Sequence, residues 1–156
     1  DWLDWQLSGL QVATLLGFNF IGRNFIHEGA NVNGTANHLA AWKGNTNMLR
    51  LLLDLGADVN WKNPGGNGTP LYWAAMIGQR EAAALLIERG ADLNAQISDG
   101  MTSLAYAAYR GHQSVVALLL EKGADTSIRD NQGLTAAERA NEQRFTGIAN
   151  LINSKG

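Results

Sequence analysis

The chain has 156 residues, 46% of them apolar and 17% charged, which is typical of one globular domain with its own core. Its net charge is −2, and its twelve basic residues are scattered singly between Arg23 and Lys155, so we expect no nucleic-acid partner, which would need a concentrated basic face. The lack of cysteine excludes disulfides, thiol nucleophiles and cysteine-based zinc sites. Because no apolar run approaches the roughly 20 residues of a membrane helix, we expect no membrane partner either.

Two series of short segments recur along the chain. The first series reads GANV, GADV, GADL and GADT, and its members begin at residues 29, 56, 90 and 123, with separations of 27, 34 and 33 residues. The second series consists of TANHLAAWKG (35–44), TPLYWAAMIG (69–78), TSLAYAAYRG (102–111) and the weaker TAAERANEQR (135–144). Self-similarity at such a period predicts a stack of repeated supersecondary units.

Each unit carries the signals of two short helices. In the third unit, Thr69 can cap a helix with its hydroxyl, Pro70 suits the first helical position, and Gly78 suits a left-handed helix end. In the fourth unit, apolar residues at helical spacing predict a second helix over residues 113–122, which Gly123 ends. We therefore expect two antiparallel helices and a projecting turn in each unit.

These segments resemble the ankyrin repeat, whose period is about 33 residues and whose signature is T-P-L-H-x-A. The resemblance covers the whole chain and is most specific in the three central units. It implies an all-α ankyrin-repeat solenoid of helix-turn-helix units, with about ten helices and short β-hairpin or loop projections. We expect one domain over residues 1–156, divided into an N-terminal cap (1–33), three central units (34–60, 61–94 and 95–127) and a C-terminal cap (128–156).

Two features depart from the family pattern. Only Gly34 separates Asn33 from Thr35, so the projection between the first two units is expected to be nearly absent. Tyr72 and Ala105 replace the histidine of the signature, while His38 retains it. The loss of that histidine removes a hydrogen bond to the turn, which affects local rigidity and leaves the fold in place.

The first helix of the third unit has two opposite faces. Residues that allow close packing share one of them: Leu71, Ala74, Ala75 and Gly78. Large side chains share the other: Trp73, Met76 and Ile77. The resemblance implies that this second face looks into the concave groove of the stack.

The same face of the neighbouring units completes a row of candidate partner-binding residues. The row consists of Trp42, Lys43, Trp73, Met76, Ile77, Tyr106, Tyr109 and Arg110, and Trp61 and Met101 extend it at the rim near the turns. For Trp73 and Tyr106, packing between units is an equal alternative to binding. For the other aromatic and apolar members of the row, binding is the favoured interpretation, since exposed aromatic residues and Arg dominate interface energetics.

The sequence contains no recognisable catalytic or cofactor motif. Its three histidines are His27, His38 and His112, and His27-Glu28 lacks the second histidine of a zinc-protease helix. Structural roles are expected for His38 and His112, which occupy positions where the family has histidine. We therefore expect no enzyme activity, no metal and no cofactor.

The predicted function is that of a non-enzymatic protein–protein interaction module that binds an unidentified partner protein through its concave groove. One alternative is an ankyrin-type inhibitor or immunity protein that blocks a partner enzyme, and another is a regulatory domain cut from a larger chain. A self-assembling structural array and an enzyme with an unrecognised groove site are more remote. We expect a monomer in the cytoplasm, with a periplasmic or secreted location left open.

Overall fold

The computed structural model describes residues 34–62 and 68–155, together with isolated positions between residues 11 and 32. These ranges contain helices and no strand. The helices are α3 (Thr35–Lys43), α4 (Thr46–Asp54), α5 (Pro70–Ile77), α6 (Arg80–Glu88), α7 (Ser103–Arg110), α8 (Gln113–Glu121), α9 (Ala136–Glu142) and α10 (Thr146–Asn153). The helix pair expected in the first unit lies mostly outside the described residues, although Ala13 and Gly22 are helical and buried.

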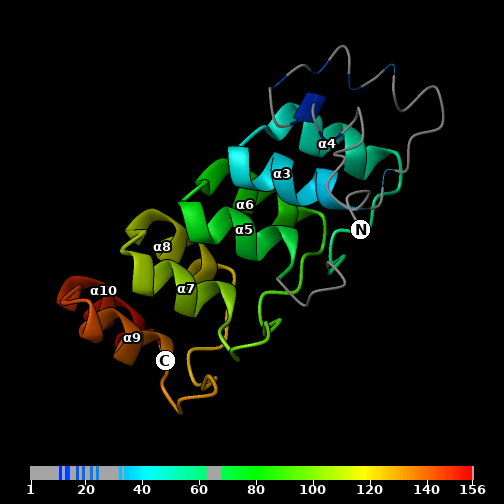
Figure 1. The fold of residues 1–156 in the computed structure, drawn as a ribbon. Helices are drawn as coiled ribbons and strands as arrows, with labels where there is room; N and C mark the ends of the chain where they lie inside the picture. The colour runs from blue at the N-terminus through cyan, green and yellow to red at the C-terminus, as the bar shows by residue number, and fades with distance from the viewer. Residues whose placement is uncertain are drawn as a thin grey trace.

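The helices form two layers along a stack of antiparallel pairs (Figure 1). The first helices of the units (α3, α5, α7 and α9) pack in sequence against one another, and the second helices (α4, α6, α8 and α10) do the same behind them. Contacts between neighbouring first helices are far more extensive than contacts between neighbouring second helices. This difference curves the stack, with the first helices on the concave side. The all-α solenoid predicted from the repeats is confirmed, and the connecting segments project as loops.

Threonine and glycine delimit the first helices as the sequence predicts. The side chains of Thr69, Thr102 and Thr135 each accept a hydrogen bond from the backbone three residues later, at 3.2–3.3 Å. In the last unit Glu138 also accepts the Thr135 amide at 2.7 Å, which completes a capping box. Gly78 ends α5 with a φ of 86°, a left-handed conformation that glycine adopts without strain.

The first helix of the second unit begins differently from those of the later units. Here α3 starts at Thr35 itself, and Gly34 occupies the N-cap position without a side-chain hydrogen bond. The Thr35 hydroxyl accepts a hydrogen bond from Gln11 Nε2 instead of capping the helix. Asn33 lies outside the described residues, so the nearly absent projection predicted there stays a prediction.

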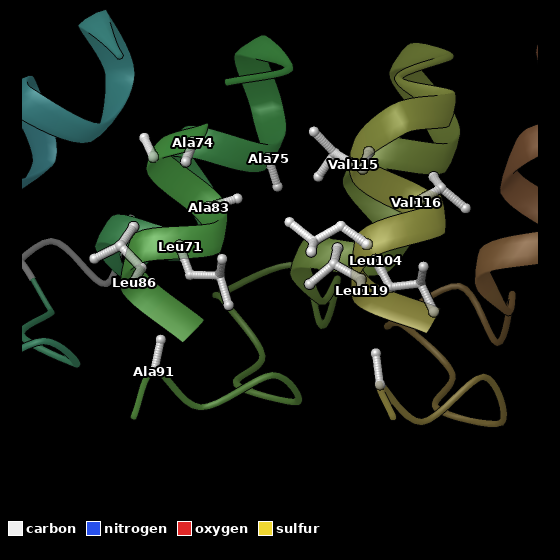
Figure 2. Close-up of a cluster of buried hydrophobic side chains, with 14 of the residues drawn as sticks. Leu71, Ala74, Ala75, Ala83, Leu86, Ala91, Leu104, Val115, Val116 and Leu119 are labelled. Carbon is white, nitrogen blue, oxygen red and sulfur yellow. The ribbon is translucent and has the colours of Figure 1, made fainter. Parts of the chain in front are cut away.

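The core lies between the two layers and runs through the stack as one cluster (Figure 2). Leu71 and Leu86 of the third unit and Leu104 and Leu119 of the fourth are completely excluded from solvent. Small residues such as Ala75 fill the closest approaches between helices. The small alanines allow neighbouring helix backbones to approach closely, so that the leucines pack tightly against them. Close packing of this kind lets short helices bury enough apolar surface to be stable.

Asparagine side chains tie the turns of successive units together. Asn60 Oδ1 accepts the backbone amide of Asp92 at 2.8 Å, and Asn94 Oδ1 accepts that of Asp125 at 2.9 Å. Within each turn the aspartate in turn accepts the amide two residues later, for example from Asn94 to Asp92 at 2.9 Å. The repeated GAD segments are thus structural, and they fix the spacing between units.

Candidate functional site

The first helices present one row of side chains that the core does not fully enclose. In α5, Leu71 and Ala75 are fully buried, whereas Trp73 and Met76 are half-buried. The same alternation occurs in α3 and α7, and it defines the concave row: Trp42, Lys43, Trp73, Met76, Ile77, Tyr106, Tyr109 and Arg110. Lys43 and Arg110 are exposed, and the other members are half-buried. The burial pattern therefore follows the helical phase expected from the sequence.

An apolar hollow of about 250 Å³ opens between α3 and α5. This N-terminal hollow is lined by Thr35, His38, Leu39, Trp42 and Trp73. Lys43 stands beside it, with Nζ 4.8 Å from the centre of the Trp42 ring. A hollow with two indole walls and one leucine wall is suited to a bulky apolar side chain.

His38 connects α3 to the turn that follows α4. Its Nε2 lies 3.0 Å from the Trp61 carbonyl oxygen, and because a carbonyl only accepts, Nε2 must carry the proton. The His38 and Trp61 rings also pack with centroids 5.0 Å apart. Burial lowers the pKa of His38, while the hydrogen bond to Trp61 opposes the shift in part. His38 is therefore a neutral structural residue at physiological pH, as the resemblance implies.

Aromatic rings continue from the N-terminal hollow to α7. The successive ring centroids are 6.3 Å apart for His38 and Trp73, 6.0 Å for Trp73 and Tyr72, 5.0 Å for Tyr72 and Tyr106, and 5.9 Å for Tyr106 and Tyr109. Trp73 Nε1 is buried and finds no acceptor among the described residues. The position of the Trp73 ring is thus determined by packing alone.

Tyr72 occupies the position at which the signature has histidine. It is 6% exposed, and its ring lies so close to Gly68 that a Cβ there would come within 2.5 Å of Cδ1. Burial raises the pKa of Tyr72, so its phenol stays neutral. Ring packing against Gly68 and Tyr106 therefore replaces the hydrogen bond lost with the histidine.

Polar side chains also hold the C-terminal ends of the first helices. Gln79 Nε2 donates to the Trp42 carbonyl at 3.2 Å, and His112 Nε2 lies 3.0 Å from the Met76 carbonyl. Both side chains stand just before a second helix and reach back to the preceding unit. They anchor the helix ends that carry the concave row, and His112 has the structural role expected of it.

A second hollow, of about 340 Å³, lies at the other end of the concave row. This C-terminal hollow is lined by Asp99, Met101, Tyr106, Tyr109, Asn131, Gln132 and Arg139. Its single cation is already engaged, since Arg139 donates from Nε to Asp130 at 2.5 Å and from Nη1 to Glu142 at 2.9 Å. The hollow is therefore polar and internally paired, unlike the N-terminal hollow.

The Asp130 carboxylate is the centre of this C-terminal network. Its side chain is 1% exposed, and it accepts the backbone amides of Gln132 and Leu134 at 2.9 and 3.1 Å. Burial alone would raise the pKa of Asp130, but the hydrogen bonds from Arg139, Leu134 and Gln132 outweigh burial and lower it. Asp130 thus stays ionised and holds the turn beneath α9.

The two residues expected at the rim differ from each other. Trp61 is half-buried against His38. Met101 is 6% exposed and belongs to the core cluster, because its turn folds back through hydrogen bonds from Ile97 N to Met101 O at 3.1 Å and from Met101 N to Asp99 Oδ1 at 2.8 Å. Met101 is therefore a core residue that touches the C-terminal hollow, whereas the sequence placed it at the rim of the concave row.

Some lining residues escaped the sequence analysis. Asn131 and Gln132 lie in a projecting turn that lines the C-terminal hollow. The signal in the sequence that could have indicated this turn is the Asx-turn pattern that begins at Asp130.

Within the described ranges, no group of three or more His, Asp or Glu residues is placed to hold a metal ion. His27 lies outside those ranges. None of the helices described is long and apolar enough to cross a membrane.

Comparison with protein families supports the repeat assignment. A model of ankyrin repeats in three copies matches residues 10–97, and a second model of ankyrin repeats in many copies matches residues 86–140. The two matches overlap over residues 86–97, at the junction of the third and fourth units, and together they extend from residue 10 into α9. No individually curated protein matches the chain.

Proposed function

Because the chain belongs to the ankyrin-repeat family, whose repeats are generally protein–protein interaction modules, we propose that it binds a partner protein through its concave row. The observation that carries this proposal is the run of large aromatic and apolar side chains left half-exposed on α3, α5 and α7. Small residues on the opposite face of these helices already provide the close packing. Contiguous apolar surface of this kind marks interaction sites.

The rigidity of the concave row favours binding. The helices that carry the row pack on the core, and Gln79 and His112 form hydrogen bonds to the C-terminal ends of α3 and α5. Contacts between aromatic rings hold the side chains along the row. A surface that is ordered before binding loses little conformational entropy in the complex. Aromatic side chains with few rotatable bonds add contact area at low entropic cost.

We further propose that the chain acts by binding and not by catalysis. His38 and His112 are both committed to backbone carbonyls, and Arg139 is committed to two carboxylates. These two histidines and Arg139 are therefore occupied in holding the fold, whereas Lys43 beside the N-terminal hollow is a surface cation suited to binding. What remains available on the concave row is contact surface.

A photo-crosslinking amino acid placed at position 76 tests this proposal. Met76 lies in the middle of the concave row, while the matched control position, Ala117, is exposed on second-layer helix α8. We expect the probe at position 76 to crosslink a discrete partner protein in the source cell, and the probe at position 117 to give none. Crosslinks from position 117 alone, or from neither position, would contradict the proposal.

A further inference from the structure

We propose that the concave row takes an acidic, apolar segment of its partner protein. A bulky apolar side chain enters the N-terminal hollow, an acidic residue beside it pairs with Lys43, and a second acidic residue reaches Arg110. This inference rests on the proposed function and deepens it by stating the chemistry of the partner.

Helices α3, α5 and α7 differ in charge from the other described helices, including the first-layer helix α9, which contains Glu138, Arg139 and Glu142. Helices α3, α5 and α7, which carry the concave row, contain no Asp or Glu, and their basic residues are Lys43 and Arg110. Acidic residues occur in the second-layer helices instead, at Asp54, Glu81, Glu88 and Glu121. A chain with a net charge of −2 therefore presents a locally cationic face at these three helices. Such a face complements acidic groups.

Lys43 and Arg110 are free to pair with a ligand. Both are exposed, and neither forms an ion pair with a described acidic residue. Other basic residues are engaged within the chain: Arg89, Lys122, Arg129 and Arg139. Among the described residues, the Lys43 ammonium interacts with the Trp42 ring, which places the cation beside the N-terminal hollow.

Helix-end electrostatics accounts for part of this placement. A basic residue at the C-terminal end of a helix interacts favourably with the helix dipole, and both Lys43 and Arg110 lie in last turns. The second-layer helices α6 and α8 also end on basic residues, with Arg89 and Lys122 at their C-caps, but these two residues form ion pairs with Asp54 and Glu121. Lys43 and Arg110 thus differ from the basic residues behind them because they have no acidic partner among the described residues.

The spacing of the two cations fits an extended segment. Lys43 and Arg110 occupy the same position two units apart, so with about 8–10 Å between neighbouring helices they lie about 16–20 Å apart. An extended chain advances about 3.3 Å per residue, which puts the two acidic residues roughly five or six residues apart. The apolar residue next to the first acid would then face the N-terminal hollow.

The two ends of this segment should be held unequally. Asp99 lies on the turn that lines the C-terminal hollow. Tyr109, the neighbour of Arg110 in the chain, lines the same hollow. An acidic residue that approaches Arg110 would therefore also approach the Asp99 carboxylate, which repels it. The acid beside Lys43 is expected to be the more strongly selected one.

A selection from random twelve-residue peptides displayed on phage, made on the immobilised protein, tests the inference. We expect the enriched peptides to carry Asp or Glu next to a bulky apolar residue, with a second acid about five or six residues away. Lys43→Glu should shift the preference beside the apolar residue to Lys or Arg and weaken a synthetic copy of the best peptide about fivefold or more. Arg110→Glu should have a smaller effect. Arg80→Glu, an exposed and unpaired control on α6, should have none.

Several results would overturn the inference. They are a selection that enriches nothing, enriched peptides without acidic residues, or a twelve-nucleotide single-stranded DNA that binds more tightly than the best peptide. Thermal unfolding of each variant, with Lys43→Gln as a milder second substitution, shows whether a loss of binding reflects a loss of fold. If the probe at position 76 still crosslinks a protein while no acidic preference is found, the proposed function survives and this inference fails. If that crosslink is also absent, both fail.

Discussion

The two ends of the concave row use similar residue types in different ways. At the N-terminal end, Trp42 and Trp73 form the walls of an apolar hollow with an unpaired lysine beside it. At the C-terminal end, Tyr106 and Tyr109 pack against the core cluster, and the neighbouring cation, Arg139, is bound by two carboxylates. Lys43 at the N-terminal end is thus free to pair with a ligand, whereas at the C-terminal end Arg139 holds the last unit in place and the unpaired cation is Arg110, which does not line that hollow.

This difference shows that position in a repeat does not decide the role of a residue. Trp42 and Tyr109 occupy equivalent positions in their first helices, yet the surroundings of Tyr109 include a structural ion-pair network and those of Trp42 do not. The role depends on whether the chain itself supplies partners for the side chain. Substitutions that remove one partner at a time can therefore separate the two ends.

The largest effect is expected at the core that both ends share. Leu119 is fully buried between α7 and α8, so Leu119→Ala should lower the free energy of unfolding by about 2–5 kcal/mol through the cavity it leaves. Urea denaturation followed by circular dichroism measures this value and sets the scale for a true core residue. If Leu119→Ala lowers the free energy of unfolding by less than about 1 kcal/mol, the stack tolerates cavities and this variant cannot serve as the reference for a core substitution.

A somewhat smaller loss is expected when the C-terminal network is broken. Arg139→Leu leaves the buried Asp130 carboxylate without its cation, and should cost about 2–4 kcal/mol of unfolding free energy. Arg129 forms an exposed pair with Glu138, so Arg129→Leu is a matched control that should cost about 1 kcal/mol or less. Equal losses for the two variants would mean that the buried pair is no more structural than the exposed one.

The same network predicts a dependence of stability on pH. Because the folded state lowers the pKa of Asp130, its contribution is fully present above the unfolded pKa of about 4 and is lost as the pH falls through the lowered folded value. Asp130→Asn should thus destabilise the protein at neutral pH, and its difference from wild type should shrink in acid. Urea denaturation at a series of pH values measures this difference. A difference that is constant into strong acid would contradict the assigned role of Asp130.

Much of the fold follows from local sequence signals, because each unit repeats them. The threonine caps at Thr69 and Thr102 and the glycine end at Gly78 are chemical requirements of short helices, and they were predictable for that reason. Thr35 does not act as a cap because α3 begins at Thr35 itself and Gly34 occupies the N-cap position. Arg144 adopts a left-handed φ of 65° where the preceding units have glycine, which no local pattern indicated.

The candidate site was less predictable, because it depends on contacts between units. Helical phase placed Trp42, Trp73 and Met76 on one face. It gave no information on the pairing of Arg139 with Asp130 or on the burial of Met101, which both arise from how a turn folds back onto its helix. The packing of Tyr72 on Gly68 and Tyr106 likewise brings together residues that no single helix relates.

The most direct test of the concave row as a contact surface is the unfolding free energy of Trp42→Ala, measured by urea denaturation beside Tyr109→Ala and Leu119→Ala. Because Trp42 is half-buried at the edge of a hollow, its truncation should cost about 1 kcal/mol, well below the Leu119→Ala value. Tyr109→Ala should fall between them, since Tyr109 packs against the core cluster. If Trp42→Ala destabilises the protein as much as Leu119→Ala does, Trp42 is a core residue and the concave row is not a contact surface.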